Sequence, residues 1–141
     1  MGVWLLGEFG EMLINGSAKD PDGNPIIVDE EEIIEVLTKI LEDNDRKGER
    51  SDTIICWVLT ALSKLTIRLK TIQKRAKELI ERYRDHMNVE IQQRACEYLQ
   101  LFEKKWDEER LGIFEPIPIK GDLESKTVFE TKDRPDFDEN D

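Results

Sequence analysis

An apolar stripe with helical spacing runs through residues 88–106 and recurs 37 residues earlier in the chain. In NVEIQQRACEYLQLFEKKW the apolar side chains fall at i, i+4, i+7, i+8, i+11 and i+15, which puts them on one face of a helix. They are Ile91, Ala95, Tyr98, Leu99, Phe102 and Trp106, and the positions 37 residues earlier are Ile54, Val58, Ala61, Leu62, Leu65 and Leu69. Two helices with the same stripe at a fixed offset predict a stack of helical repeats.

Three further segments carry the same kind of pattern. Residues 3–14 are apolar with Gly7 and Gly10 on one face, where a second helix could approach closely. A second helix is expected to begin at Asp29, where Glu32 three residues later completes a capping box. The earlier stripe at 54–69 belongs to a helix expected at 51–69 and capped by Ser51. After a break near Lys70, the third further segment is a helix through Arg84. The core of the second helix would be Ile33, Ile34, Leu37, Ile40 and Leu41, and that of the fourth Ile72, Ala76, Leu79, Ile80 and Tyr83.

The predicted fold is therefore all-α, an alpha-solenoid of HEAT- or armadillo-like repeats. It has about five helices within residues 1–110, followed by an extended segment. No stretch shows the alternation of a strand. Residues 111–119 are apolar but contain Pro116 and Pro118, so we expect an extended segment that packs on the last helix. Residues 120–141 are polar and acidic, which predicts a flexible tail.

Residues 15–28 are rich in turn formers and read as a surface loop inserted into the repeat. The loop contains one calcium-like pattern, because Asp20, Asp22, Asn24 and Glu31 match positions 1, 3, 5 and 12 of an EF-hand loop. Position 6 of such a loop needs glycine, however, and here it is Pro25. We therefore predict a surface insertion, and binding of an ion remains the minor alternative.

The charge of the chain is strongly acidic, with a formal net charge of −11, which argues against general nucleic-acid binding. The sign reverses between Lys64 and Arg84, where eight bases stand against two acids. A solvated outer face is the simpler interpretation of this run. The alternative is a docking surface for an acidic partner or an anionic membrane.

The sequence offers little that could carry catalysis, and we predict no enzyme, no catalytic residue, no cofactor and no metal site. His86 is the single histidine and lies in a polar turn, so a triad or a histidine metal site lacks its parts. Carboxylate pairs such as Glu8 and Glu11 carry little information in a chain with 32 acids. Cys56 and Cys96 lack metal-ligand spacing and are expected to be free thiols.

Four segments, in the same order, resemble one protein family. VEIQQRACEYLQLF at 89–102 resembles the "VELQQRAVEY" segment near the end of the trunk of clathrin-adaptor large subunits. VWLLGEFGEMLING at 3–16, PIIVDEEEIIEVLTKIL at 25–41 and WVLTALSKLTIRL at 57–69 resemble segments of the gamma type of that family. The departures are Phe9 for the usual tyrosine, the DPDGNP insertion, EPIP at 115–118 and the basic fourth helix.

This resemblance implies a scaffold segment from the C-terminal part of a gamma-adaptin trunk, acting in vesicle-mediated protein transport. The partners it implies are the second large, medium and small adaptor chains, with clathrin and an Arf-type GTPase contacted mostly by other regions. The implied location is the cytoplasmic face of trans-Golgi and endosomal membranes, where the whole complex is peripheral. Another helical-repeat scaffold, of coatomer or transport-receptor type, remains an alternative, and a calcium-binding helical protein is a more distant one.

Overall fold

Six α-helices, five of them stacked in two rows, make up the computed structural model, which describes residues 1–47 and 51–117. The α-helices are α1 (Gly2–Ile14), α2 (Glu30–Asp45), α3 (Asp52–Arg68), α4 (Gln73–Glu81), α5 (Val89–Leu101) and α6 (Asp107–Ile113). Two 3-10 helices, η2 (Lys70–Ile72) and η3 (Lys104–Trp106), precede α4 and α6. No strand forms among the described residues, where Lys19 and Pro25 make an isolated bridge. The prediction of an all-α solenoid fold is confirmed.

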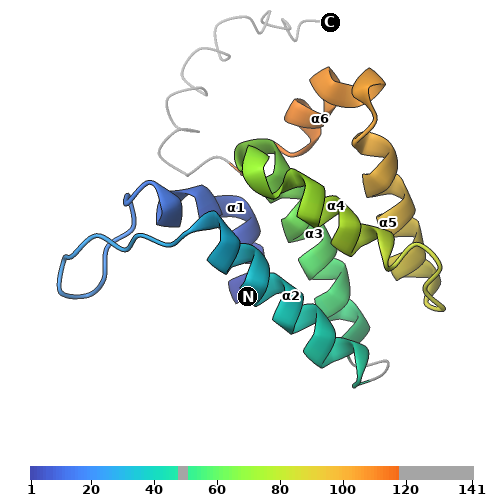
Figure 1. Ribbon diagram of the computed structural model, residues 1–141, viewed down its shortest axis with the longest axis horizontal. Coiled ribbons are helices and arrows are strands. Elements are labelled where there is room, and N and C mark those ends of the chain that lie inside the picture. Colours follow the sequence, from blue (N-terminus) through green and yellow to red (C-terminus); the bar gives the residue numbers. More distant parts are fainter. Residues whose placement is uncertain (48–50, 118–141) are drawn as a thin grey trace, which may run out of the picture.

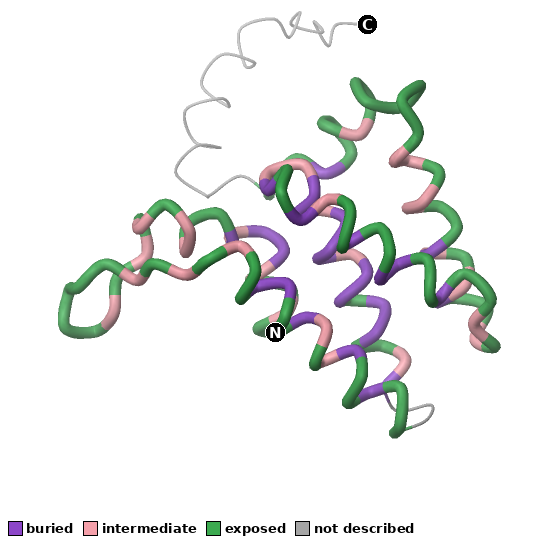
Figure 2. Tube along the Cα trace, in the orientation of Figure 1, coloured by how far each residue is buried: buried purple, intermediate pink, exposed green. Residues whose placement is uncertain are grey.

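Helix α3 lies at the centre of the stack and contacts α1, α2, α4 and α5 (Figure 1). Helices α1, α3 and α5 are successive neighbours in one row, and α2 and α4 pack across them as the second row. Figure 2 shows the buried residues concentrated along α3 and on the inner sides of its neighbours. This arrangement follows from the stripes, because each helix has one apolar face that it can bury only against the next helix.

The predicted core stripes match the buried residues closely in the fourth helix and only in part in the helix that opens the pattern. All five expected positions of the fourth helix, from Ile72 to Tyr83, are buried. In the 88–106 stripe Ile91 and Ala95 are buried, whereas Tyr98, Leu99 and Phe102 are half-buried and Trp106 is 38% exposed. One position in α3 was wrong, because Ile54 is 37% exposed and its neighbour Ile55 is 1% exposed. Ile54 lies in the first turn of α3, on the side that no described helix covers.

Two of the predicted helix starts use the expected caps. The capping box of Asp29 and Glu32 is present at α2, with the Asp29 backbone N–H donating to Glu32 Oε2 at 3.3 Å. At α5 the Asn88 side chain accepts the backbone N–H of Glu90 at 2.9 Å. Ser51 stands at the N-cap position of α3 as expected, but its side chain makes no capping hydrogen bond there.

The helix expected over 88–106 is shorter than its stripe. Helix α5 ends at Leu101, and Glu103 adopts an extended conformation before η3 and α6. Arg110 stabilises the break, because its Nη1 donates to the Leu101 carbonyl at 3.0 Å and its guanidinium lies 5.7 Å from the Phe102 ring. A side chain that folds back from the next helix thus satisfies a carbonyl at the open end of α5.

The chain after Arg110 also differs from the expectation of an extended segment starting at residue 111, because α6 continues through Ile113. Phe114 then turns inward, is 5% exposed, and lies with its ring centroid 5.9 Å from that of Tyr98 on α5. Residues 118–119 and the predicted tail at 120–141 lie outside the described residues. The division of the chain at 110 and 119 stays a prediction.

The close approach expected at Gly7 and Gly10 is confirmed, and its partner is α3. A Cβ added at Gly7 would lie 2.9 Å from Ala61 Cα, and one at Gly10 would lie 2.8 Å from Leu65 Cδ2. Glycine at position 7 therefore lets the backbones of α1 and α3 approach each other closely, and glycine at position 10 makes room for the Leu65 side chain.

Candidate functional site

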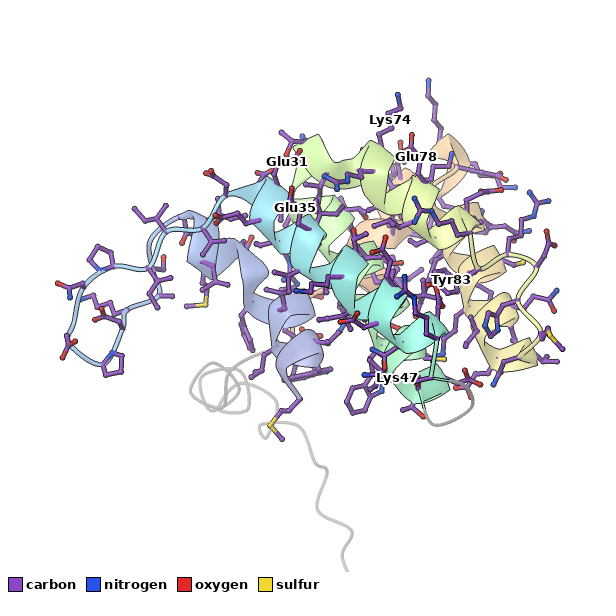
Figure 3. The ribbon with its side chains drawn as sticks, turned by 60° about the horizontal axis from the view of Figure 1, so that its bottom comes forward. Glu31, Glu35, Lys47, Lys74, Glu78 and Tyr83 are labelled. Atoms are coloured by element: carbon purple, nitrogen blue, oxygen red, sulfur yellow. The ribbon has the colours of Figure 1, made fainter. Side chains whose placement is uncertain are left out.

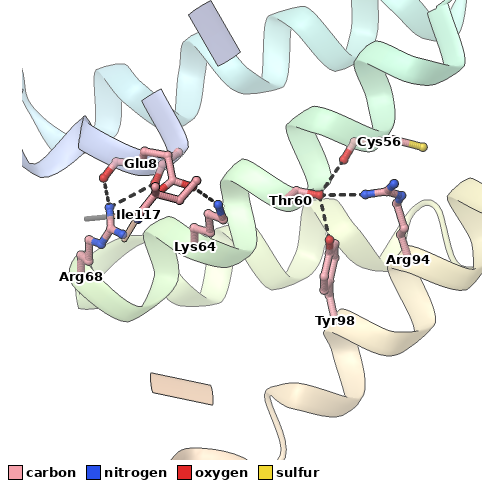
Figure 4. A network of polar contacts seen from close by, with 9 residues as sticks. Glu8, Cys56, Thr60, Lys64, Arg68, Arg94, Tyr98 and Ile117 are labelled. Atoms are coloured by element: carbon pink, nitrogen blue, oxygen red, sulfur yellow. Dashed lines mark hydrogen bonds and ion pairs between the residues drawn. The ribbon is translucent and has the colours of Figure 1, made fainter. Parts of the chain in front are cut away.

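A buried carboxylate, Glu8, joins three separate parts of the chain (Figure 4). Its side chain has no exposed surface and pairs with the ammonium group of Lys64 on α3. Its Oε2 also accepts the backbone N–H of Ile117 at 3.2 Å. Arg68 donates to the backbone carbonyl of Glu8, and to that of Gly7 at 3.2 Å. The cluster ties α1 to α3 and to the segment that follows α6.

A second polar cluster lies between α3 and α5 (Figure 4). Thr60 donates its hydroxyl to the Cys56 carbonyl at 3.0 Å, so its oxygen is left to accept from the Tyr98 hydroxyl at 2.7 Å. Arg94 Nη1 donates to the same oxygen at 3.2 Å, and Arg94 Nη2 pairs with Glu90. Arg94, which the α5 stripe leaves at its edge, therefore contacts the neighbouring helix.

The surroundings of His86 show a structural role for this residue. A polar cleft of about 650 Å³ lies between the end of α2, the start of α3 and the turn before α5, and His86 and Asp45 line it. The His86 Nδ1 accepts the Asn88 backbone N–H at 3.0 Å, and the Asn88 amide donates to Asp52 at 2.7 Å. The Tyr83 hydroxyl donates to Asp45 at 2.8 Å. These polar groups hold three element ends together.

The two cysteines differ in accessibility, and both are free thiols as expected. Cys56 is buried in α3, and burial raises the pKa of its thiol. Cys96 is exposed on α5. A buried thiol with a raised pKa is a poor nucleophile, which fits a packing role for Cys56.

The calcium-like loop is held by hydrogen bonds of its own. The Asp20 carboxylate accepts the backbone N–H of Asn24 at 2.8 Å and its side-chain amide at 3.2 Å. Glu31, at position 12 of the calcium-like pattern, pairs instead with Arg75 on α4 at 2.8 Å. Within the described residues, no three of the side chains His, Cys, Asp and Glu come close enough to hold a metal ion.

Some bases of the run at 64–84 have a partner within the fold, and the others are exposed without an ion pair among the described residues. Lys64 and Arg68 point into the α1–α3 contact, and Arg75 and Arg84 pair with Glu31 and Glu81. A further four bases are exposed on η2, α4 and the turn after it, and make no ion pair within residues 1–47 and 51–117. They are Lys70, Lys74, Lys77 and Arg82. Figure 3 shows Lys74 pointing away from the helices.

Apolar side chains remain exposed on the outer side of α1 and α2. Leu5 is 45% exposed, Met12 40% and Val36 52%. Two shallow grooves of about 480 and 340 Å³ run over this surface, and both are lined by Leu6 and Leu13. We call this surface the α1–α2 apolar face. None of the helices described has the length and apolarity needed to cross a membrane.

Sequence reasoning missed the role of Glu8, which it treated as one of many acids. Helix periodicity gave no signal, because Glu8 lies about 130° around the helix from the midpoint of Gly7 and Gly10. The contact between Tyr83 and Asp45 was also missed. It joins residues 38 positions apart, and helix periodicity does not show such distances.

No family model matches the chain, and three of its relatives are gamma subunits of AP-1 complexes. The chain is 34% identical to human "AP-1 complex subunit gamma-like 2" over 119 residues, which are 84% of this chain and 14% of that protein. It is 34% identical to the Dictyostelium discoideum "AP-1 complex subunit gamma" over 107 residues, covering 73% of the chain and 12% of the relative. With Arabidopsis thaliana "AP-1 complex subunit gamma-1" the identity is 31% over 104 residues, covering 74% and 11%.

Proposed function

Because the chain belongs to the gamma-adaptin family of adaptor-complex large subunits, we propose that it is a scaffold segment of such a subunit, acting in vesicle-mediated protein transport. The observation that carries this proposal is the 31–34% identity with AP-1 gamma subunits over 73–84% of the chain. The chain spans 11–14% of the length of these relatives. The functions of a whole gamma subunit are therefore part of the proposal.

The geometry supports a role as a scaffold rather than as a catalyst. Stacked helical repeats build extended surfaces that can bind partners, and each repeat contacts only its neighbours in the stack. The polar clusters at Glu8, Thr60 and Tyr83 are occupied in joining helices to one another. We assign no reaction to the segment.

The partners we propose are the second large, medium and small chains of an adaptor complex. Clathrin and an Arf-type GTPase would be contacted mainly through other regions of the subunit. The location we propose is the cytoplasmic face of trans-Golgi and endosomal membranes, with the whole complex attached peripherally. The α1–α2 apolar face supports this assignment to an assembly, because apolar surface of this kind marks a protein contact.

Affinity purification of the tagged full-length protein from its own cells tests the proposal. We expect the second large, medium and small chains of one adaptor complex to co-purify in comparable amounts. Recovery of coatomer subunits, or of a transport receptor with its cargo, would overturn the assignment. Imaging of the same tagged protein should place it on structures that also contain clathrin.

A further inference from the structure

The solvent side of α4 carries a row of lysines that the fold itself does not use. Lys70, Lys74 and Lys77 lie at i, i+4 and i+7, which places them on one helix face, opposite the buried Ile72, Ala76 and Leu79. With Arg82 they form what we call the α4 basic face. Like charges at these spacings repel each other. Glu78 and Glu81, which follow Lys74 and Lys77 by four residues, offset part of this repulsion.

The acids around this face leave it positive. Glu81 pairs with Arg84, and Glu31 on α2 pairs with Arg75. Glu78 is the remaining acid on α4 and stands against four bases without an ion pair in the described contacts. On a chain with a net charge of −11, this local excess of positive charge is an exception.

The end of the described chain lies beside the start of the α4 basic face. The Ile117 backbone N–H is bonded to Glu8, and Arg68 is bonded to the Glu8 carbonyl. Lys70, the first residue of the basic face, follows Arg68 by two positions. Ile117, the last described residue, is thus joined through Glu8 to Arg68, which lies two residues before the face begins.

The residues that follow have the complementary charge. Residues 133–141, DRPDFDEND, contain five acids and one base. Asp136 is 19 residues beyond Ile117, and a chain of that length can span up to roughly 60 Å. Helix α4 has nine residues and is therefore only about 14 Å long. The acidic residues can thus reach every lysine of the face.

We propose that residues 133–141 bind the α4 basic face of the same molecule. Charge complementarity selects this face, because it is the part of the described surface where unpaired positive charge gathers. Attachment to the same chain gives the acidic segment a high effective concentration there. An anionic partner from outside must displace the segment before it can use the face. This inference does not depend on the assignment to an adaptor complex.

Zero-length crosslinking of the full chain tests the proposal, with carbodiimide joining carboxylates to lysine amines and mass spectrometry locating the links. At low protein concentration and about 0.1 M salt, we expect the acids of 133–141 to link to Lys70, Lys74 and Lys77. The exposed lysines Lys39 and Lys104 should link at least several-fold less. Raising the salt to about 1 M, where the Debye length falls from about 10 Å to about 3 Å, should remove the preference.

Charge-swapped variants separate a specific contact from general attraction. Lys74→Glu with Lys77→Glu should abolish the tail links to the remaining Lys70, whereas the matched control Lys39→Glu with Lys104→Glu should leave them unchanged. Adding Asp136→Lys and Asp138→Lys to the first pair should restore links between the two segments with the roles exchanged. Circular dichroism confirms that each variant keeps its helices.

Two results would overturn the proposal. One is an even spread of tail links over Lys39, Lys104 and the α4 lysines. The other is a set of links that survives the reversal at Lys74 and Lys77. Either result would mean that the α4 basic face is open to an external anionic partner. Vesicles of anionic lipid should then bind the unchanged protein more strongly than the Lys74→Glu, Lys77→Glu variant.

Discussion

Glu8 is a charged residue in the buried contact between α1 and α3. Its side chain has no solvent-exposed surface, and its charge is balanced by Lys64, whose side chain is 17% exposed. Burying such a pair gives little net stabilisation, but removing one partner is costly because the other charge is left uncompensated. The pair therefore favours one arrangement of α1, α3 and the segment at Ile117.

Replacing Glu8 by glutamine tests this view. Glu8→Gln should lower the free energy of unfolding by about 2–4 kcal/mol, because Lys64 keeps its charge in a largely buried site. Urea unfolding of the variant gives the value. The double variant with Lys64→Met should recover a large part of the loss, since the unpaired charge is then gone. A loss in Glu8→Gln below about 0.5 kcal/mol would mean that the pair is not buried in solution.

Ionisation of Tyr83 should make the free energy of unfolding depend on pH in the alkaline range. Burial, and then the hydrogen bond to Asp45, raise the pKa of Tyr83 above its usual value of 10.0. The folded state therefore holds the phenol proton more tightly than the unfolded chain. This contribution is fully present below pH 10 and is lost as the pH rises through the folded pKa, with a slope of up to about 1.4 kcal/mol per pH unit. Tyr83→Phe should remove that slope, and Tyr98→Phe should keep it, in urea unfolding at several pH values.

At the scale of single elements, the contact of α1 with α3 depends on glycine at one position. Gly7→Ala should destabilise the protein by about 1–3 kcal/mol, because the new methyl group meets the α3 backbone at Ala61. Gly112→Ala is the matched control in α6, where nothing lies within 4 Å, and alanine should stabilise that helix by up to about 1 kcal/mol. Thermal unfolding distinguishes the two. Equal effects would exclude close packing at Gly7.

The helices that could be predicted from the sequence are those whose apolar stripe is also their buried face. In α4 the stripe from Ile72 to Tyr83 is buried throughout. The end of α5 could not be predicted, because the stripe continues through Phe102 and Trp106 without a helix-breaking residue. The break depends on Arg110, which returns from α6 to the Leu101 carbonyl, and such a contact has no local signature.

The basic surface, too, could be predicted from the sequence only in part. The basic run was visible in the sequence, but its division into buried and exposed members was not. Lys64 and Arg68 point into a helix contact, whereas Lys74 and Lys77 face solvent. Residue type cannot separate these cases, because long basic side chains occupy both environments. The partner helix that decides between them comes from residues 2–14, more than fifty positions away.

At the scale of the whole molecule, the α1–α2 apolar face is the surface at which we expect a partner chain of the proposed assembly to bind. Leu5→Glu with Met12→Glu should reduce co-purification of partner chains at least tenfold, since burial of each side chain stabilises the contact by about 1.5–3 kcal/mol. The free energy of unfolding should change by less than about 0.5 kcal/mol, because both residues are half-exposed. Met87→Glu with Val89→Glu, at 98% and 71% exposure, is the control. Unchanged co-purification would contradict the assignment of this face.

The bond between Glu8 and the Ile117 N–H joins residues 109 positions apart, and so brings the two ends of the described chain together. In an open stack each repeat touches only its neighbours, and unfolding can start at either end and spread. Here α1 and the last described segment hold each other. Fraying of one end requires release of the other. The stack should therefore unfold in one cooperative step and fold more slowly than its local helices alone would allow, because a long loop must close first.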